Sequence, residues 1–380
     1  MSIQVCHIST FPPTQCGLAT YISDLMRHQP DVSHVRVRLV YPGDRYDNDL
    51  STIRIPLQNV AAYAFAADAI NLSNFDVISL QHEFGIFGGT DGEFVLDLVS
   101  RLQIPVVTTF HTVYAKMPPS KRQILGSLAK ISKHLVVLTD ASKKIMIDLF
   151  DLPESKISVI HHGIPDIRFI APEESALRKH LGRGPVFVSA GHIKPKKGHD
   201  VALAALARLR RIHPDLKYLI VGAPQPQFDR EGSYESFLAE AIAQAGMQEN
   251  VIRVNEYLCF EEFVQTIQAA DIGLVTYRTA LQNSSGILPL MVACGRPVVA
   301  TDFEYAKTVA NQAMGVFLVG VDNSEALFET LRDLTDDIER IRSLMMPAYF
   351  SARSWSWQQA ARDYLAAFTK VRRDRVPDSS

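Results

Sequence analysis

The chain has 380 residues, of which 47% are hydrophobic and 21% are charged. This length is too great for one ordinary core and favours two domains, and the composition is that of a folded globular protein. The formal net charge of -2 disfavours a nucleic-acid-binding protein, which is expected to be basic.

The cysteines and the two ends of the chain disfavour several further classes. The four cysteines are scattered without the close pairs of a metal site, so we expect reduced thiols and a cytoplasmic protein. The start, MSIQVCHISTFPP, does not resemble a signal peptide, and no apolar stretch approaches the roughly 18 residues of a membrane span. Residues 370–375 are basic and are interpreted as a solvated helix end, so at most a peripheral membrane contact is expected.

Short β-rich runs recur along the chain, and each is followed by a helical pattern. They span residues 4–9, 35–41, 77–81, 105–111, 134–139 and 157–162, and then 186–191, 218–222, 251–254, 272–277, 297–301 and 315–319. Most are continuously apolar, which indicates strands buried on both faces of parallel sheets. Alternating strands and helices predict right-handed βαβ units, and two such series predict an α/β protein with two Rossmann-like domains.

The boundary between the two domains is expected after the segment HHGIPD, where a polar stretch precedes the second series of strands. We therefore expect a first domain over residues 1–168 and a second over residues 169–352. Residues 353–380 are predicted to form a helix that packs on the first domain, because one of its faces is apolar. That face carries Trp357, Ala360, Tyr364 and Phe368.

The first strand leads into the loop STFPPTQCGLATYISDL, in which Gly17 stands where the loop turns into a helix. A glycine there lets backbone amides approach a ligand, and a helix start attracts anions. Many such turns carry glycine for geometry alone, so both interpretations remain open. The segment is not G-x-G-x-x-G, which argues against a dinucleotide site.

Polar side chains follow two later strands of the first half. His82 and Glu83 begin the glycine-rich segment HEFGIFGG, and His111 closes the strand in PVVTTFHT. Ligands of parallel sheets bind at the carboxyl ends of the strands, where a histidine and a carboxylate could orient a hydroxyl or assist proton transfer. A capping loop and a satisfied core histidine are the alternatives.

Two segments of the second half join a strand or loop to a helix. In SAGHIKPKKGHD, three lysines share a turn, where cations and backbone amides suit a diphosphate. In QNSSGILPLMVACG, Ser284, Ser285 and Gly286 resemble a helix start with exposed amides, which is an anion-binding device. A solvated basic turn and an ordinary capped helix are the respective alternatives.

Together these segments resemble glycosyltransferase family 4, in order and spacing as well as in individual motifs. The resemblance also rests on PESKISVIHHGI, AADIGLVTY and GRPVVATD, and it covers nearly the whole chain. It implies the GT-B fold, in which two Rossmann-like, doubly wound parallel-sheet domains face a cleft. It further implies that a nucleoside-diphosphate sugar binds the second domain and donates a hexose to a saccharide or other hydroxyl acceptor on the side of the first.

The resemblance also assigns roles to residues. His111, near the transferred sugar, Lys197, which holds the diphosphate, and Glu83 are expected to be catalytic. No cofactor and no metal are expected, because the D-x-D sequence of Asp47 and Asp49 is interpreted as a solvated turn. Around the donor we expect Gly17, His192, Lys197, Gln282, Ser284, Ser285, Gly286 and Ile287, and on the side of the acceptor and sugar His82, Gly85, Gly88 and Gly89.

The sequence departs from the family pattern at three positions. His192 replaces the arginine of the R-x-x-x-x-K pair, and Gln282 and Leu290 replace the two glutamates that are separated by seven residues. Leucine cannot bind the ribose as the second glutamate does, so ribose recognition and the expected retention of stereochemistry stay open. The variant Q-x-S-S-G-x-L resembles a bacterial mannosyltransferase-like subgroup, which points to GDP-mannose. A nucleotide-sugar epimerase of the same fold and a catalytically inactive nucleotide-sugar-binding protein are the alternatives.

Overall fold

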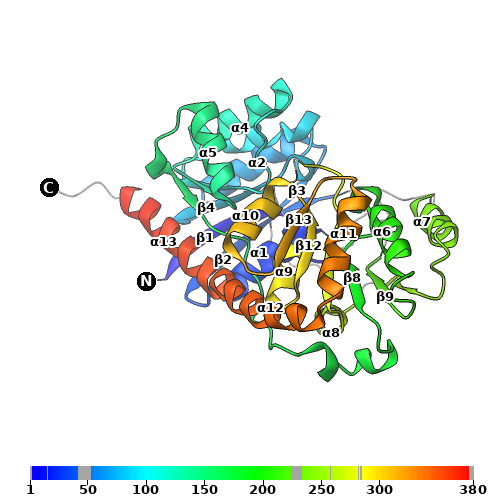
Figure 1. The fold of residues 1–380 in the computed structure, drawn as a ribbon. Coiled ribbons are helices and arrows are strands. Elements are labelled where there is room, and N and C mark those ends of the chain that lie inside the picture. The colour runs from blue at the N-terminus through cyan, green and yellow to red at the C-terminus, as the bar shows by residue number, and fades with distance from the viewer. Residues whose placement is uncertain are drawn as a thin grey trace. The chain divides into compact units, whose positions relative to one another are not determined.

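The computed structural model describes residues 2–14, 16–41, 53–223, 233–256, 258–280, 282 and 285–375. The chain divides into two compact units (Figure 1). Unit 1 comprises Met1–Gly163 together with Trp355–Ser380, and unit 2 comprises Ile164–Ser354. No helix in the described ranges is long and apolar enough to cross a membrane.

Unit 1 contains a sheet whose described part has seven strands in the order β3-β2-β1-β4-β5-β6-β7. All neighbouring strands pair in parallel. Each strand predicted for this half is present with ends shifted by a few residues, and β3 is an additional edge strand. The strands are β1 (Ile3–Ser9), β2 (Val32–Val40), β3 (Ile53–Pro56), β4 (Val77–His82), β5 (Val106–Phe110), β6 (His134–Val137) and β7 (Ile157–Val159).

Helices cover both faces of this sheet, which explains why its strands are continuously apolar. In β1, Val5 packs with one face, whereas Cys6 and Ile8 pack with the other, because successive side chains alternate. The face of Val5 is covered by α1 (Gly17–Arg27) and α13 (Trp357–Arg375). The other face is covered by α2 (Val60–Asn71), α3 (Val95–Val99), α4 (Pro119–Ile131) and α5 (Asp140–Phe150).

The last helix, α13, drawn in red in Figure 1, is part of unit 1. Trp357, Tyr364 and Phe368 are buried in the same cluster as residues of α1 and β1, and α13 also contacts β4 and β5. Gly163 permits the close approach of Trp357, since a Cβ at this glycine would lie 2.2 Å from the indole ring. The apolar stripe of the helix is therefore the face that packs on the first sheet.

Unit 2 repeats the design with a parallel sheet in the order β10-β9-β8-β11-β12-β13. Its strands are β8 (Val186–Ala190), β9 (Lys217–Val221), β10 (Val251–Val254), β11 (Ile272–Val275), β12 (Val298–Thr301) and β13 (Val316–Val319). Its helices are α6 (His199–Leu209), α7 (Ser233–Gln244), α8 (Phe260–Gln268), α9 (Ile287–Ala293), α10 (Glu304–Gln312), α11 (Ser324–Thr335) and α12 (Ile338–Ser351).

Each sheet has a point where the strand order reverses. It lies between β1 and β4 in unit 1 and between β8 and β11 in unit 2. In open parallel sheets, ligands bind outside the carboxyl ends of the strands at this switch point, because the connections leave there in opposite directions. The loops that follow these four strands are therefore the places to examine for a site.

Candidate functional site

In unit 2, three side chains meet beside the carboxyl ends of β8 and β11. The Lys197 ammonium donates a hydrogen bond to the Tyr277 hydroxyl at 2.6 Å and lies 4.2 Å from the centre of its ring. The Tyr277 hydroxyl lies 3.1 Å from the Ser285 hydroxyl. Lys197 belongs to the short turn Pro195–Lys197 after β8, and Tyr277 follows β11. The two strands of the switch point thus bring this cluster together.

A glycine keeps the backbone beside Lys197 open. Gly191 follows β8 with a φ of +98°, and a Cβ there would lie 3.6 Å from Lys197 Nζ and 3.1 Å from Ile287 Cγ1. Gly222, which follows β9, also has no room for a side chain, because its Cβ would lie 2.3 Å from the Gly191 carbonyl oxygen. Without side chains at these positions, a ligand can approach the strand ends closely.

The turn after β8 carries positive charge that lowers the pKa of its own members. Burial, followed by the charges of Lys197 and Lys196, lowers the pKa of Lys194. Burial, followed by Lys194 and Lys197, lowers the pKa of His192, so its ring is neutral at neutral pH. Burial is the larger cause of both shifts, and the smaller electrostatic part reflects the positive charge of the turn, which favours an anionic ligand.

The start of α9 contributes less than its sequence suggests. The helix is only seven residues long, so its dipole is small. The Ser285 hydroxyl also accepts a hydrogen bond from the Leu288 amide at 3.2 Å, which satisfies one of the terminal amides. The groups of this cluster that are available to an anion are therefore expected to be Lys197 and the two hydroxyls rather than the helix end.

The other residues predicted near the donor are placed as follows. Gly286 is exposed next to Ser285, and the carbonyl of Gln282 accepts a hydrogen bond from the Tyr305 amide at 3.1 Å. Ser284 lies outside the described residues, as do Asp47 and Asp49.

In unit 1, His111 follows β5 and is 7% exposed. Its Nε2 lies 2.8 Å from Gln81 Oε1, while the amide nitrogen of Gln81 donates to the hydroxyls of Ser79 and Thr109 at 3.2 and 3.4 Å. Because an amide oxygen only accepts, this orientation of Gln81 places the proton of His111 on Nε2. Burial lowers the pKa of His111 to about 3, so the ring is neutral and Nδ1 is a hydrogen-bond acceptor.

The chain of hydrogen bonds behind His111 continues to α13. The Tyr364 hydroxyl lies 2.9 Å from the Thr109 hydroxyl and 2.9 Å from the Tyr21 hydroxyl. The ring of Tyr21 in turn packs edge-on against His111, with 4.7 Å between ring centres, and contacts His162 at 5.1 Å. Helices α1 and α13 therefore hold His111 in place from the side of the sheet that they cover.

His82 and Glu83 make contacts inside unit 1. His82 has no exposed surface, and its ring packs among aromatic side chains of the β4 and β5 ends. Burial lowers its pKa to about 3, and neither ring nitrogen has a hydrogen-bond partner within the described residues. Glu83 accepts hydrogen bonds from the Phe84 amide at 3.1 Å and from the Thr112 hydroxyl at 2.5 Å. It thereby joins the loop after β4 to the residue that follows His111.

The glycines of unit 1 fall into two kinds. Gly88 and Gly89 serve packing, since a Cβ on Gly88 would lie 1.8 Å from the Leu57 carbonyl oxygen and Gly89 has a φ of +80°. Gly17 and Gly85 have no heavy atom within 4 Å of the position where a Cβ would lie. Of the predicted glycines, Gly17 and Gly85 are thus the ones that leave room for a ligand.

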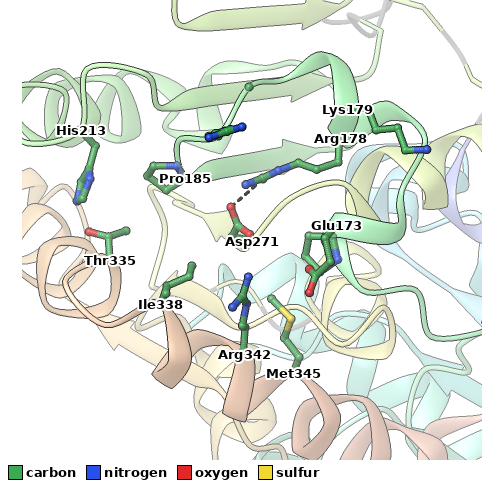
Figure 2. Close-up of a pocket in the computed structure, with 13 residues that line it drawn as sticks. Glu173, Arg178, Lys179, Pro185, His213, Asp271, Thr335, Ile338, Arg342 and Met345 are labelled. Atoms are coloured by element: carbon green, nitrogen blue, oxygen red, sulfur yellow. Dashed lines mark hydrogen bonds and ion pairs between the residues drawn. The ribbon is translucent and has the colours of Figure 1, made fainter.

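A cavity of about 820 Å³ in unit 2 lies at the opposite edge of its sheet (Figure 2). Pro185 and Asp271, which line it, directly precede β8 and β11. Arg178 pairs with Asp271 at 2.8 Å, and the same carboxylate accepts a hydrogen bond from the Val186 amide at 2.7 Å. Because the cavity is at the amino ends of the strands and this buried ion pair is internally satisfied, we do not identify it as the candidate site.

Sequence reasoning missed several members of the two clusters, namely Gln81 and Tyr21 in unit 1 and Tyr277 in unit 2. Gln81 could have been noticed, since it is a polar residue near the carboxyl end of a fully buried strand. Tyr277 stands just beyond the end of a buried strand, which is the same positional signal that identified His111. Tyr21 gives no such signal, because an aromatic residue on a helix is ordinarily part of a core.

Comparison with known families matches both halves of the chain. The family model described as "Glycosyltransferase Family 4" matches residues 16–168, and the model "Glycosyl transferases group 1" matches residues 184–337.

Curated relatives are similar over most of the chain. A GDP-mannose-dependent monoacylated alpha-(1-6)-phosphatidylinositol monomannoside mannosyltransferase of Corynebacterium glutamicum is 28% identical over 92% of this chain and 93% of that protein. D-inositol 3-phosphate glycosyltransferases of Thermobispora bispora and Stackebrandtia nassauensis are each 26% identical, over 71% and 69% of this chain. The chain spans 66% and 60% of the length of these two proteins.

Solved structures share the fold. A glycosyltransferase from Rickettsia africae superposes with a TM-score of 0.76 at 16% identity, covering 97% of this chain and 98% of that one. The Anabaena protein Alr3699/HepE in complex with UDP and glucose gives 0.75 at 14% identity, covering 97% and 100%. The sucrose-phosphate synthase of Thermosynechococcus elongatus gives 0.79 at 14% identity, covering 97% and 99%. At such identities the similarity shows the fold alone, which is GT-B.

Proposed function

The chain belongs to glycosyltransferase family 4, and on this premise we propose that it transfers a hexose from a nucleoside-diphosphate sugar to a saccharide or other hydroxyl acceptor. The cluster of Lys197, Tyr277 and Ser285 at the switch point of unit 2 carries the proposal. We favour GDP-mannose as the donor, supported by the GDP-mannose dependence of the Corynebacterium relative and by the sequence variant around Ser285.

Unit 2 is proposed to bind the nucleotide sugar. The Lys197 ammonium would pair with the diphosphate, and the hydroxyls of Tyr277 and Ser285 would donate hydrogen bonds to its oxygens. The diphosphate gains negative charge as the glycosidic bond breaks, so fixed positive charge stabilises the transition state more than the ground state. Gly191 would let the donor lie against the strand ends, next to Ile287.

Unit 1 is proposed to present His111 to the transferred sugar. Since His111 is neutral and holds its proton on the nitrogen that faces Gln81, Nδ1 can accept a hydrogen bond from a sugar hydroxyl. A pKa of about 3 also means that His111 does not serve as a general acid near neutral pH. Glu83 would act indirectly, by holding the loop beside His111 through Thr112.

The transfer is proposed to need no metal and to retain stereochemistry, as the family resemblance implies. The support for metal independence is that Lys197 supplies the positive charge that a cation would otherwise provide. Leu290 is buried in α9, so the ribose contact of the family glutamate must come from another group.

Two measurements test the proposal. In a thermal-shift panel of nucleoside diphosphates and their sugars, a ligand at about 100 times its Kd should add about 2.7 kcal/mol to the free energy of unfolding. The bound donor is then incubated with and without saccharide acceptors. Sugar transfer to an acceptor supports the proposal, whereas an epimer formed from the donor alone, or binding without turnover on any acceptor, contradicts it.

A further inference from the structure

A second group of positive charges lies in unit 1. Lys130, Lys133, Lys156 and Lys370 surround a cavity of about 410 Å³, which we call the lysine pocket. Lys130 is in the last turn of α4, Lys133 and Lys156 lie just before β6 and β7, and Lys370 belongs to α13. Because all strands of the sheet are parallel, the pocket is at the edge opposite to the one that His111 occupies.

No acidic residue lines the lysine pocket in the described part of the chain. Glu154, next to Ser155 in the chain, is paired with Lys143 at 2.9 Å, and Asp76 is paired with Arg372 of α13 at 3.0 Å. The Lys370 ammonium donates to the Ser155 carbonyl at 3.0 Å, which holds it against the turn before β7. An ammonium has three donors, so this contact leaves Lys370 able to bind a ligand as well.

Two lysines of the pocket lie near enough for the charge of one to act on the other. Lys156 is partly buried, and its pKa is lowered by burial and then by the charge of Lys133. Like charges held near one another weaken the fold, and groups whose pKa is perturbed in this way occur preferentially at functional sites. The negative end of α4 favours a cation at Lys130, whereas Lys156 belongs to another segment, just before β7.

We propose that the lysine pocket binds a phosphate-bearing group and is a second anion site, separate from the donor site of unit 2. Lysine is a compact charge that pairs well with phosphate oxygens. The cavity volume of about 410 Å³ falls in the usual range of small-molecule pockets, roughly 300–1,000 Å³. Ile131, which is 42% exposed at the pocket, adds an apolar surface that suits the organic part of a phosphate ester. The ligand is either a soluble phosphate compound or a phospholipid headgroup.

Acetylation of lysines on the full-length wild-type protein tests the pocket residue by residue. The protein is treated with an amine-acetylating reagent, with and without inorganic pyrophosphate, and each lysine is quantified by mass spectrometry. The proposal predicts protection of Lys133, Lys156 and Lys370, with no change at the exposed Lys144. Protection of Lys197 is scored in the same spectra, so the donor site and the lysine pocket succeed or fail independently.

A second arm distinguishes the two sources of phosphate. Vesicles of phosphatidylcholine with phosphatidic acid replace pyrophosphate, and vesicles of phosphatidylcholine alone serve as the control. Protection by pyrophosphate identifies a soluble ligand, and protection only by the phosphatidic acid vesicles identifies a lipid headgroup. Equal acetylation of the pocket lysines under all conditions overturns the proposal.

Two double variants separate the pocket from the overall charge. Lys133→Gln with Lys156→Gln empties the pocket of two ammonium groups, whereas Arg101→Gln with Lys144→Gln removes the same charge from exposed positions elsewhere in unit 1. Binding of the protecting ligand should weaken about tenfold for each lysine lost in the first variant, and stay unchanged in the second. An equal loss of ligand binding in both double variants would show nonspecific electrostatic attraction and contradict a specific binding site in the lysine pocket. Circular dichroism confirms that both variants are folded.

Discussion

The Nε2 atom of His111 lies 2.8 Å from Oε1 of Gln81, and this contact decides which nitrogen of the histidine carries the proton. In this orientation the amide nitrogen of Gln81 donates to the Ser79 and Thr109 hydroxyls, and its oxygen faces His111. Gln81 therefore orients a residue that is expected to face the sugar, although it is itself fully buried.

Replacing Gln81 should change the tautomer of His111 and lower turnover. In Gln81→Leu the Nε2 proton loses its acceptor, so both tautomers become populated. We expect kcat to fall about tenfold, which corresponds to the free energy of one hydrogen bond. Nitrogen-15 NMR of the histidine ring measures the tautomer directly. Gln29→Leu is the matched control, because Gln29 is also buried in unit 1 but bonds the Ala361 carbonyl. A normal His111 spectrum in Gln81→Leu would refute this role.

Lys197→Ala should lower kcat more than it weakens nucleotide binding, because the charge on the leaving diphosphate grows in the transition state. Tyr277→Phe keeps the ring beside the ammonium but removes the hydroxyl between Lys197 and Ser285, and should cause a smaller loss. Lys194→Ala and Lys196→Ala are the controls and should have much weaker effects. Similar kinetics for all three lysine variants would mean that the turn is only a solvated surface.

Gly191→Ala should weaken binding of the nucleotide sugar. The added methyl group would lie 3.1 Å from Ile287 Cγ1 and 3.6 Å from Lys197 Nζ, and the φ of +98° strains any side chain. Gly182→Ala is a matched control, because its φ is +84° but no heavy atom lies near its Cβ position. Both variants should lose about 1–2 kcal/mol of stability from the backbone, and only Gly191→Ala should raise the Kd for the donor. Calorimetry measures both quantities.

His82→Phe should make unit 1 more stable, especially in acid. The pKa of His82 is about 3 in the folded protein against 6.5 for the free side chain. The unfolded chain therefore takes up a proton below about pH 6.5 that the folded chain does not, so the free energy of unfolding decreases as the pH is lowered. Phenylalanine suits the surrounding aromatic rings and removes two unpartnered nitrogens, so we expect a gain of about 1 kcal/mol at pH 7 and a weaker dependence below pH 6.5.

The same variant tests the place of His82 in the site. If His82 only supports the loop after β4, His82→Phe retains most of the transferase activity. A large rise in the KM for the acceptor, with stability maintained, would instead place the imidazole in contact with the acceptor.

Transfer activity should be unaffected by a chelator, because Lys197 is proposed to stabilise the departing diphosphate. The assay compares initial rates before and after EDTA treatment. Loss of activity that magnesium or manganese restores would contradict this, and Asp47 and Asp49 would be the first residues to replace.

The sequence by itself determined the sheets. A strand covered on both faces is mostly apolar rather than alternating, so the runs in β1, β4, β5, β8 and β11 could be recognised and assigned to parallel sheets. Among the described strands, β3 was the one that the sequence did not predict, since a partly exposed edge strand of four residues has little hydrophobic pattern. The carboxyl ends of the recognised strands also located His111 and Lys197, because strands that are parallel end at a common edge.

Only the tertiary structure decided which side chains meet at those ends. Lys197 and Tyr277 are 80 residues apart and Thr109 and Tyr364 are 255 apart, and no periodicity relates such distant positions. Burial likewise separated residues that look alike in the sequence: His82 is enclosed by aromatic rings, whereas His111 is held by a glutamine through one nitrogen. A one-dimensional pattern shows the end of a strand where a side chain lies, but its direction, partner and protonation depend on the packing of elements that are remote in the chain.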